Sequence, residues 1–116
     1  MNLLIVEESE AMWRLIREVI CAPSWRCHKC SEGSQALAAY ARHRPDWVLM
    51  DVEMKAADGI AIAGQICAAF PDAKIVILTS CDDADLRQAA REAGACGYVL
   101  KENLFEARRL LQATPE

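Results

Sequence analysis

Short apolar runs alternate along this chain with longer segments in which apolar residues recur every three or four positions. The runs suit buried strands and the longer segments suit amphipathic helices. The predicted strands span residues 2–6, 25–30, 47–50, 74–78 and 98–100. Strands that alternate with helices are typical of strand–helix–strand units around a parallel sheet. We therefore expect an α/β domain with a doubly wound, five-stranded parallel sheet, five helices and the flavodoxin-like strand order 2-1-3-4-5.

Capping residues mark where the predicted helices begin and end. Ser9 can cap the first helix, Asp58 with Gly59 begins the third, and Asp82 or Asp83 can cap the fourth. Proline stops the first three helices, because it disfavours helical backbone before it, and Gly94 ends the fourth. The prolines are Pro23, Pro45 and Pro71.

Helical spacing also predicts which side chains face the core. The second helix is predicted over residues 34–43 and the last over residues 103–112. The expected inward residues are Met12, Trp13, Ile16, Val19 and Ile20; Leu37, Tyr40 and Ala41; Ile62, Ile66 and Phe70; and Leu86, Ala89, Ala90 and Ala93.

Polar residues close four of the predicted strands. Glu7 and Glu8 follow the first strand, Asp51 the third, Thr79 with Ser80 the fourth, and Lys101 the fifth. In a parallel sheet all these ends meet at one edge, and ligands bind where the strand order reverses. Strands one and three are neighbours at that point. The sequence therefore predicts one crevice that contains the acidic groups, a hydroxyl group and an ammonium group.

Composition narrows the class of protein. The chain has 116 residues, of which 53% are hydrophobic and 26% charged, as expected for one globular domain over residues 1–116. No run approaches the roughly 20 apolar residues of a membrane span, and no signal peptide is recognisable, so a cytoplasmic location is expected. The formal net charge of −4 and the absence of a basic stripe argue against nucleic-acid binding by this domain.

Six cysteines are scattered through apolar segments. This distribution predicts buried, reduced thiols and no disulfide bonds. Cys27 and Cys30 have the C-x-x-C spacing of some metal and redox sites. Residues three apart on a strand point to opposite faces, so this pair is not expected to share a ligand.

The predicted crevice suits phosphoryl transfer. Crowded carboxylates favour a hard divalent cation with oxygen ligands, above all Mg²⁺. A carboxylate can serve as the nucleophile while the metal ion and a lysine neutralise phosphate charge. Asp51 is the central carboxylate and Lys101 the lysine.

At these residues the chain resembles the receiver domains of two-component response regulators, the chemotaxis-regulator-like family, over nearly its whole length. The resemblance lies in the acidic pair after the first strand, in D-V-E-M at 51–54 with D-G at 58–59, in T-S at 79–80 and in G-Y-V-L-K at 97–101. It implies that Asp51 takes a phosphoryl group from a histidine kinase, a phosphotransfer protein or a small phosphodonor. It also implies a conformational switch rather than an enzyme acting on a separate substrate.

The resemblance further implies roles for the other crevice residues. Mg²⁺ would be held by Glu7, Glu8, Asp51 and Glu53, the last through its backbone carbonyl. The resemblance places Thr79 and Lys101 against the phosphoryl oxygens, and Thr79 and Tyr98 as the switch pair. A packed strand aromatic is the alternative for Tyr98. The last two strands and helices are the expected surface for an output protein or domain, such as a transcription regulator, and for a homodimer.

Some residues depart from the family pattern. Glu7 and Glu8 stand where two aspartates, or Glu then Asp, are usual, and the longer side chains put Mg²⁺ affinity in question. Lys55 replaces a common proline and is expected to lie in solvent. The alternative is that its ammonium reaches Glu8 or the phosphate and partly replaces the metal charge. A degenerate receiver that works by protein contact alone is therefore an open alternative. An aspartyl phosphatase using Asp51 and Glu53 ranks below it, because the chain has no length for a cap over the site.

Overall fold

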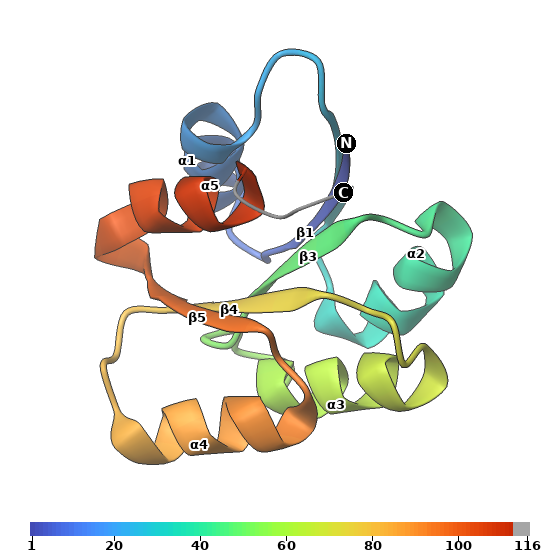
Figure 1. Cartoon of the computed structure of the whole chain (residues 1–116), viewed down its shortest axis with the longest axis vertical. Coiled ribbons are helices and arrows are strands. Elements are labelled where there is room, and N and C mark those ends of the chain that lie inside the picture. Colours follow the sequence, from blue (N-terminus) through green and yellow to red (C-terminus); the bar gives the residue numbers. More distant parts are fainter. Residues whose placement is uncertain (113–116) are drawn as a thin grey trace.

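Five parallel strands form a single sheet in the computed structural model, which describes residues 1–112 (Figure 1). The order is β2-β1-β3-β4-β5, which confirms the predicted flavodoxin-like arrangement. The strands are β1 (Asn2–Val6), β2 (Arg26–Cys30), β3 (Trp47–Asp51), β4 (Ile75–Thr79) and β5 (Gly97–Leu100). β1 and β3 are neighbours, so the sheet has the expected reversal of strand order between them.

Helices cover both faces of this sheet (Figure 1). The five are α1 (Glu10–Ile20), α2 (Ala36–His43), α3 (Gly59–Ala69), α4 (Ala84–Ala93) and α5 (Leu104–Gln112). Two short 3₁₀ turns, η1 (Gly33–Gln35) and η2 (Lys101–Asn103), precede α2 and α5. α1 and α5 lie on one face, and α2, α3 and α4 on the other. Within residues 1–112, none of the helices combines the length and apolar character that a membrane span requires.

The central strands are buried on both faces, which explains their unbroken apolar runs. Alternate residues of each strand enter separate cores. Leu4, Val48 and Ile77 pack toward α2, α3 and α4, whereas their sequence neighbours pack toward α1 and α5. β2 is an edge strand with two exposed positions, as its polar alternation predicts. The sheet is thus a rigid base for the residues that follow its strands.

The predicted caps are confirmed. The Ser9 hydroxyl accepts the N–H of Met12, and the Asp58 carboxylate accepts two N–H groups at the start of α3. Asp83, not Asp82, caps α4 by accepting the N–H of Leu86. Gly94 ends that helix at φ 105°, a backbone conformation that glycine adopts without steric cost.

The predicted inward face of α2 was partly wrong. Tyr40 is buried as expected, but Leu37 and Ala41 are exposed, and Ala36 takes the inward position one turn before Tyr40. The α-helix also begins at Ala36 rather than at the predicted residue 34, because Gly33–Gln35 form the η1 turn, and Ala36 and Tyr40 lie one turn apart on its inward face. The other inward residues are buried or partly buried as predicted.

The prediction that no cysteine is bridged was also wrong. Cys21, the residue after α1, forms a disulfide with Cys27 on β2. The fold brings the end of α1 beside the edge strand, a proximity that sequence spacing does not reveal. Cys27 does not pair with Cys30, as expected, and Cys30 is a buried free thiol. Of the other free cysteines, Cys67 is partly buried, and Cys81 and Cys96 are exposed.

Candidate functional site

Asp51 lies at the end of the most deeply buried part of the sheet. It is the last residue of β3 and is 1% exposed. Its Oδ1 accepts the backbone N–H of Glu53 at 2.9 Å, which fixes the side chain over the turn that follows the strand. A buried carboxylate requires a compensating partner, because removing an unpaired charge from water is costly.

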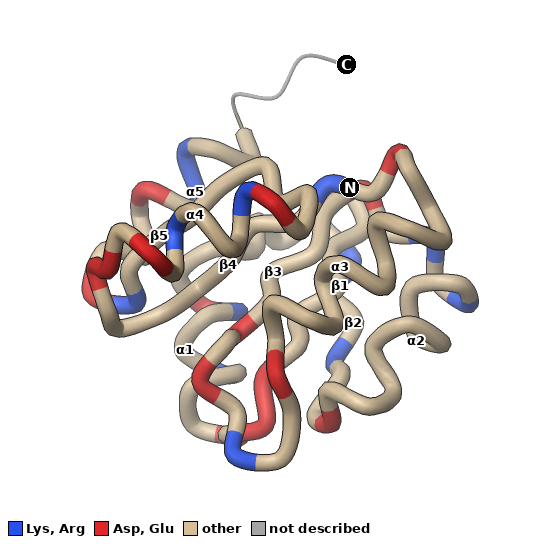
Figure 2. The backbone as a smooth tube through the Cα atoms, turned by 90° about the horizontal axis from the view of Figure 1, so that it is seen from below, with Lys and Arg blue, Asp and Glu red and all other residues tan. Residues whose placement is uncertain are grey.

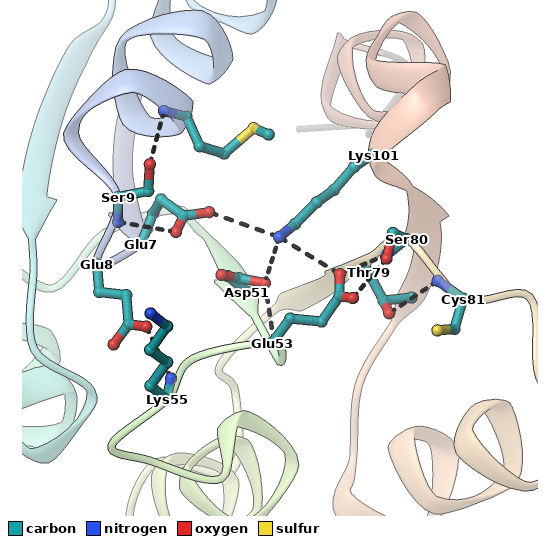
Figure 3. A network of polar contacts seen from close by, with 11 residues as sticks. Glu7, Glu8, Ser9, Asp51, Glu53, Lys55, Thr79, Ser80, Cys81 and Lys101 are labelled. Atoms are coloured by element: carbon teal, nitrogen blue, oxygen red, sulfur yellow. Dashed lines mark hydrogen bonds and ion pairs between the residues drawn. The ribbon is translucent and has the colours of Figure 1, made fainter.

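Lys101 provides that partner. Its Nζ lies 2.9 Å from Asp51 Oδ1, 3.4 Å from Glu53 Oε1 and 3.9 Å from Glu7 Oε1 (Figure 3). Burial lowers the pKa of Lys101, but the hydrogen bond and charge of Asp51, together with the other two carboxylates, outweigh burial and raise it. The ammonium is therefore charged and is shared among three acids.

Glu7 is the most perturbed acid in the crevice. It is 2% exposed, and burial is the main reason why its pKa rises to about 7. The Asp51 carboxylate also raises this pKa, while the N–H of Ser9 and the charge of Lys101 lower it. Ser9 N–H donates to Oε2, whereas Oε1 accepts no hydrogen bond from residues 1–112. One buried oxygen is thus available to a cation or a proton.

Glu8 points away from this crevice. Its Oε1 accepts the backbone N–H of Lys55 at 2.7 Å, and both residues are exposed (Figure 3). Lys55 is therefore in solvent as predicted. Successive residues at the end of a strand project to opposite sides, so the structure brings Glu7 and not Glu8 into the pocket.

Glu53 and Ser80 bridge the two loops over the crevice. Glu53 Oε1 accepts the Ser80 N–H at 2.5 Å, and Ser80 Oγ donates to Oε2. Burial raises the pKa of Glu53, but the Ser80 hydrogen bonds and Lys101 outweigh it, so the pKa is lowered. Acidic positions gather on the loops at this end of the sheet, near α1 and β3 (Figure 2). The Glu53–Ser80 contact was missed at the sequence level.

Thr79 and Tyr98 lie on the β4 and β5 side of the site. Thr79 is fully buried at the end of β4, and its Oγ1 accepts the N–H of Cys81. The Tyr98 hydroxyl donates to the Cys81 carbonyl oxygen at 2.6 Å, and the Arg87 guanidinium lies 4.4 Å from its ring centroid. Both predicted switch residues therefore contact the same short loop after β4.

The carboxylates partly fit a hard cation. Glu7 Oε1 and the Asp51 carboxylate supply oxygen donors in the pocket, and oxygen is the ligand that Mg²⁺ prefers. Glu8 is outside the pocket, and Lys101 lies among the other acids. No group of three or more acidic, histidine or cysteine residues within 1–112 is arranged to hold a metal ion.

Comparison with known proteins identifies the family. The model of the response regulator receiver domain matches residues 3–114. The chain belongs to this family. Receiver domains are signalling switches of two-component systems; they bind Mg²⁺ and interact with histidine kinases and output domains.

Relatives of this receiver domain include the response regulator MprA of Mycobacterium leprae, with 31% identity over 119 residues. That match covers 98% of this chain and 52% of the relative, so the receiver domain spans about half the length of such regulators. The LuxR-family response regulator from Aurantimonas has a TM-score of 0.87 at 24% identity, covering 97% of this chain and 82% of that one. CheY of Borrelia burgdorferi, solved with CheX, BeF₃ and Mg²⁺, has a TM-score of 0.86 at 17% identity, covering 98% and 90%. These two structures share the fold.

Proposed function

We propose that Asp51 is the phosphoryl acceptor of this receiver domain. A carboxylate oxygen of Asp51 attacks phosphorus, and the bond from phosphorus to the donor atom breaks with its electron pair leaving on the donor. The product is an acyl phosphate, and the donor is a histidine kinase, a phosphotransfer protein or a small phosphodonor. The domain is itself the group that is modified and turns over no separate substrate.

The 2.9 Å contact between Lys101 Nζ and Asp51 Oδ1 supports this proposal most directly. A cation held at the nucleophile can neutralise charge that develops on the transferring group, and in a buried site it needs no reorganisation. Thr79 ends the neighbouring strand β4 beside the two. Its hydroxyl accepts the N–H of Cys81 and can donate its own proton to a phosphoryl oxygen.

Mg²⁺ is the proposed cofactor, and it supplies positive charge for the phosphoryl oxygens when bound. Glu7, Asp51 and the backbone carbonyl of Glu53 are its proposed ligands. Glu8 joins them only if its side chain leaves the Lys55 N–H. Magnesium accompanies BeF₃ in the Borrelia CheY structure, which has the same fold.

We propose that the loop after β4 transmits the conformational change from the phosphorylation site to the output surface. Thr79, Tyr98 and this loop already form hydrogen bonds with one another through Cys81. A change at the Thr79 hydroxyl therefore reaches Tyr98 through the backbone of one residue. We propose α4, β5 and α5 as the surface for an output protein or domain, for example a transcription regulator, and for a homodimer.

The whole of residues 1–116 is proposed as one receiver domain, although residues 113–116 lie outside the described part. A cytoplasmic location is proposed because histidine kinases and small phosphodonors act there. We propose no contact of this domain with nucleic acid or membrane, in line with its net charge of −4.

A degenerate receiver is the second candidate. The position of Glu8 outside the pocket favours it, because within residues 1–112 no group of three carboxylates is arranged to hold a metal ion. Such a protein would act through its surface alone, without phosphorylation.

One experiment separates the two candidates. The protein is incubated with acetyl phosphate and Mg²⁺, and its intact mass is measured. A phosphoryl adduct that is absent from Asp51→Asn supports the phosphoacceptor. The absence of any adduct with Mg²⁺ or Mn²⁺ refutes it and supports the degenerate receiver.

A further inference from the structure

The carboxylate of Glu53 occupies an anion-binding site at the mouth of the pocket. Three donors surround it: the Ser80 N–H at 2.5 Å, the Ser80 hydroxyl, and Lys101 Nζ at 3.4 Å. They come from two different segments, the loop after β4 and the residue after β5. A backbone N–H, a hydroxyl and an ammonium that converge on one anion are the groups that also bind phosphate oxygens.

The same donors lie next to the nucleophile. Lys101 contacts Glu53 and Asp51 at once, and the Glu53 N–H binds Asp51 Oδ1. The Glu53 side chain is 33% exposed and that of Asp51 only 2%. Glu53 is therefore the outer acid and Asp51 the inner one, so a phosphoryl group that enters from solvent passes the Glu53 side chain on its way to Asp51.

We propose that Glu53 is an internal competitor of the phosphoryl group, an anionic gate that must release Ser80 and Lys101 before Asp51 is phosphorylated. This inference rests on the proposed function of Asp51. The phosphoryl group of a donor that approaches Asp51 would lie close to the Glu53 carboxylate, and like charges in a partly buried pocket repel strongly. Displacement into solvent relieves the repulsion and frees the donors for the phosphoryl oxygens.

The group transfer itself is unchanged by the gate. With acetyl phosphate, an Asp51 oxygen forms the new bond to phosphorus, and the bond between phosphorus and the acetyl oxygen breaks. The electron pair leaves with acetate. Glu53 stays ionised throughout and exchanges only its hydrogen-bond donors, so it is a positioning residue rather than a catalytic one.

The test compares initial rates of adduct formation with acetyl phosphate and Mg²⁺ by intact mass. Glu53→Gln keeps the size of the side chain and the backbone carbonyl but removes the charge. We expect it to be phosphorylated about tenfold faster than the unmodified protein, since one charge-assisted contact is worth roughly this factor. Glu18→Gln removes the same charge from an exposed position on α1 and should leave the rate unchanged. A Glu53→Gln rate equal to or below that of the unmodified protein overturns the gate.

A second measurement needs neither metal nor phosphorylation. In Asp51→Asn, the thermal midpoint is measured in potassium sulfate and in potassium chloride of equal ionic strength. Sulfate stabilises folded proteins in general, so the gate predicts that it raises the midpoint of Asp51→Asn/Glu53→Gln by more than it raises that of Asp51→Asn alone. Equal responses of the two variants overturn the gate. If no protein forms an adduct with acetyl phosphate, the proposed function fails, and this sulfate comparison still decides whether Glu53 fills an anion site.

Discussion

Neutralising Glu7 should stabilise the protein, and the gain should depend on pH. The pKa of Glu7 rises from 4.5 to about 7 in the fold. The folded state therefore binds the proton more tightly than the unfolded state does, so this group's contribution to stability is fully present below pH 4.5 and is lost as pH rises to 7. At 1.36 kcal/mol per pKa unit, the ionised form costs about 3 kcal/mol at pH 8 and less than about 1 kcal/mol at pH 5.

Glu7→Gln tests this reasoning. The amide retains an oxygen for the Ser9 N–H but carries no charge next to Asp51. Urea unfolding in EDTA should show the variant to be more stable than the unmodified protein by about 3 kcal/mol at pH 8, with most of the difference gone at pH 5. Glu8→Gln is the matched control, since Glu8 is exposed and should change stability by no more than about 0.5 kcal/mol. A Glu7→Gln protein that is less stable at pH 8, or a difference that does not vary with pH, would refute the assignment.

Three further substitutions test other contacts by urea unfolding. Lys101→Met leaves the buried Asp51 carboxylate without its cation and should lower the free energy of unfolding by about 3 kcal/mol; an unchanged midpoint would mean that the pair adds no net stability. Gly33→Ala places a methyl group 2.6 Å from the Ala57 Cβ and should lower the free energy of unfolding by about 1 to 3 kcal/mol. A variant as stable as the unmodified protein would contradict this expectation. Cys27→Ser opens the bridge to Cys21 across a separation of six residues. It should lower the free energy of unfolding by about 2 kcal/mol, because the unfolded chain gains loop entropy. An oxidised protein that is no more stable than the variant would contradict this expectation.

Much of this fold is readable from the sequence because its signals are local. Strand–helix alternation gave the sheet, and Ser9, Asp58 and Gly94 marked helix ends through contacts within a few residues. The prediction for the inward face of α2 was partly wrong because that face is not set by local contacts. Leu37 and Ala36 are neighbours about 100° apart around the helix, and only the packing of α2 against the sheet decides which of them turns inward with Tyr40.

In the candidate site, too, some contacts are predictable from the sequence and others are not. Asp51 and Lys101 were expected together because parallel strand ends must meet, and they lie 2.9 Å apart. Glu8 adjoins Glu7 in sequence, and only the twofold alternation of a strand separates them in space. Glu53 and Ser80 are 27 residues apart, and no spacing rule predicts that the one side chain binds the other. The bridge between Cys21 and Cys27 likewise depends on the packing of α1 beside β2.

The distribution of free thiols has a practical consequence. Cys81 and Cys96 are exposed, while Cys30 is buried and Cys67 is half-buried. Cys81 adjoins the hydroxyl of Tyr98 through its own carbonyl, and Cys96 precedes β5 by one residue. A maleimide dye would therefore attach preferentially to Cys81 and Cys96, in the two segments next to Tyr98. Fluorescence of the labelled native chain would then record rearrangement around Tyr98 without any engineered cysteine.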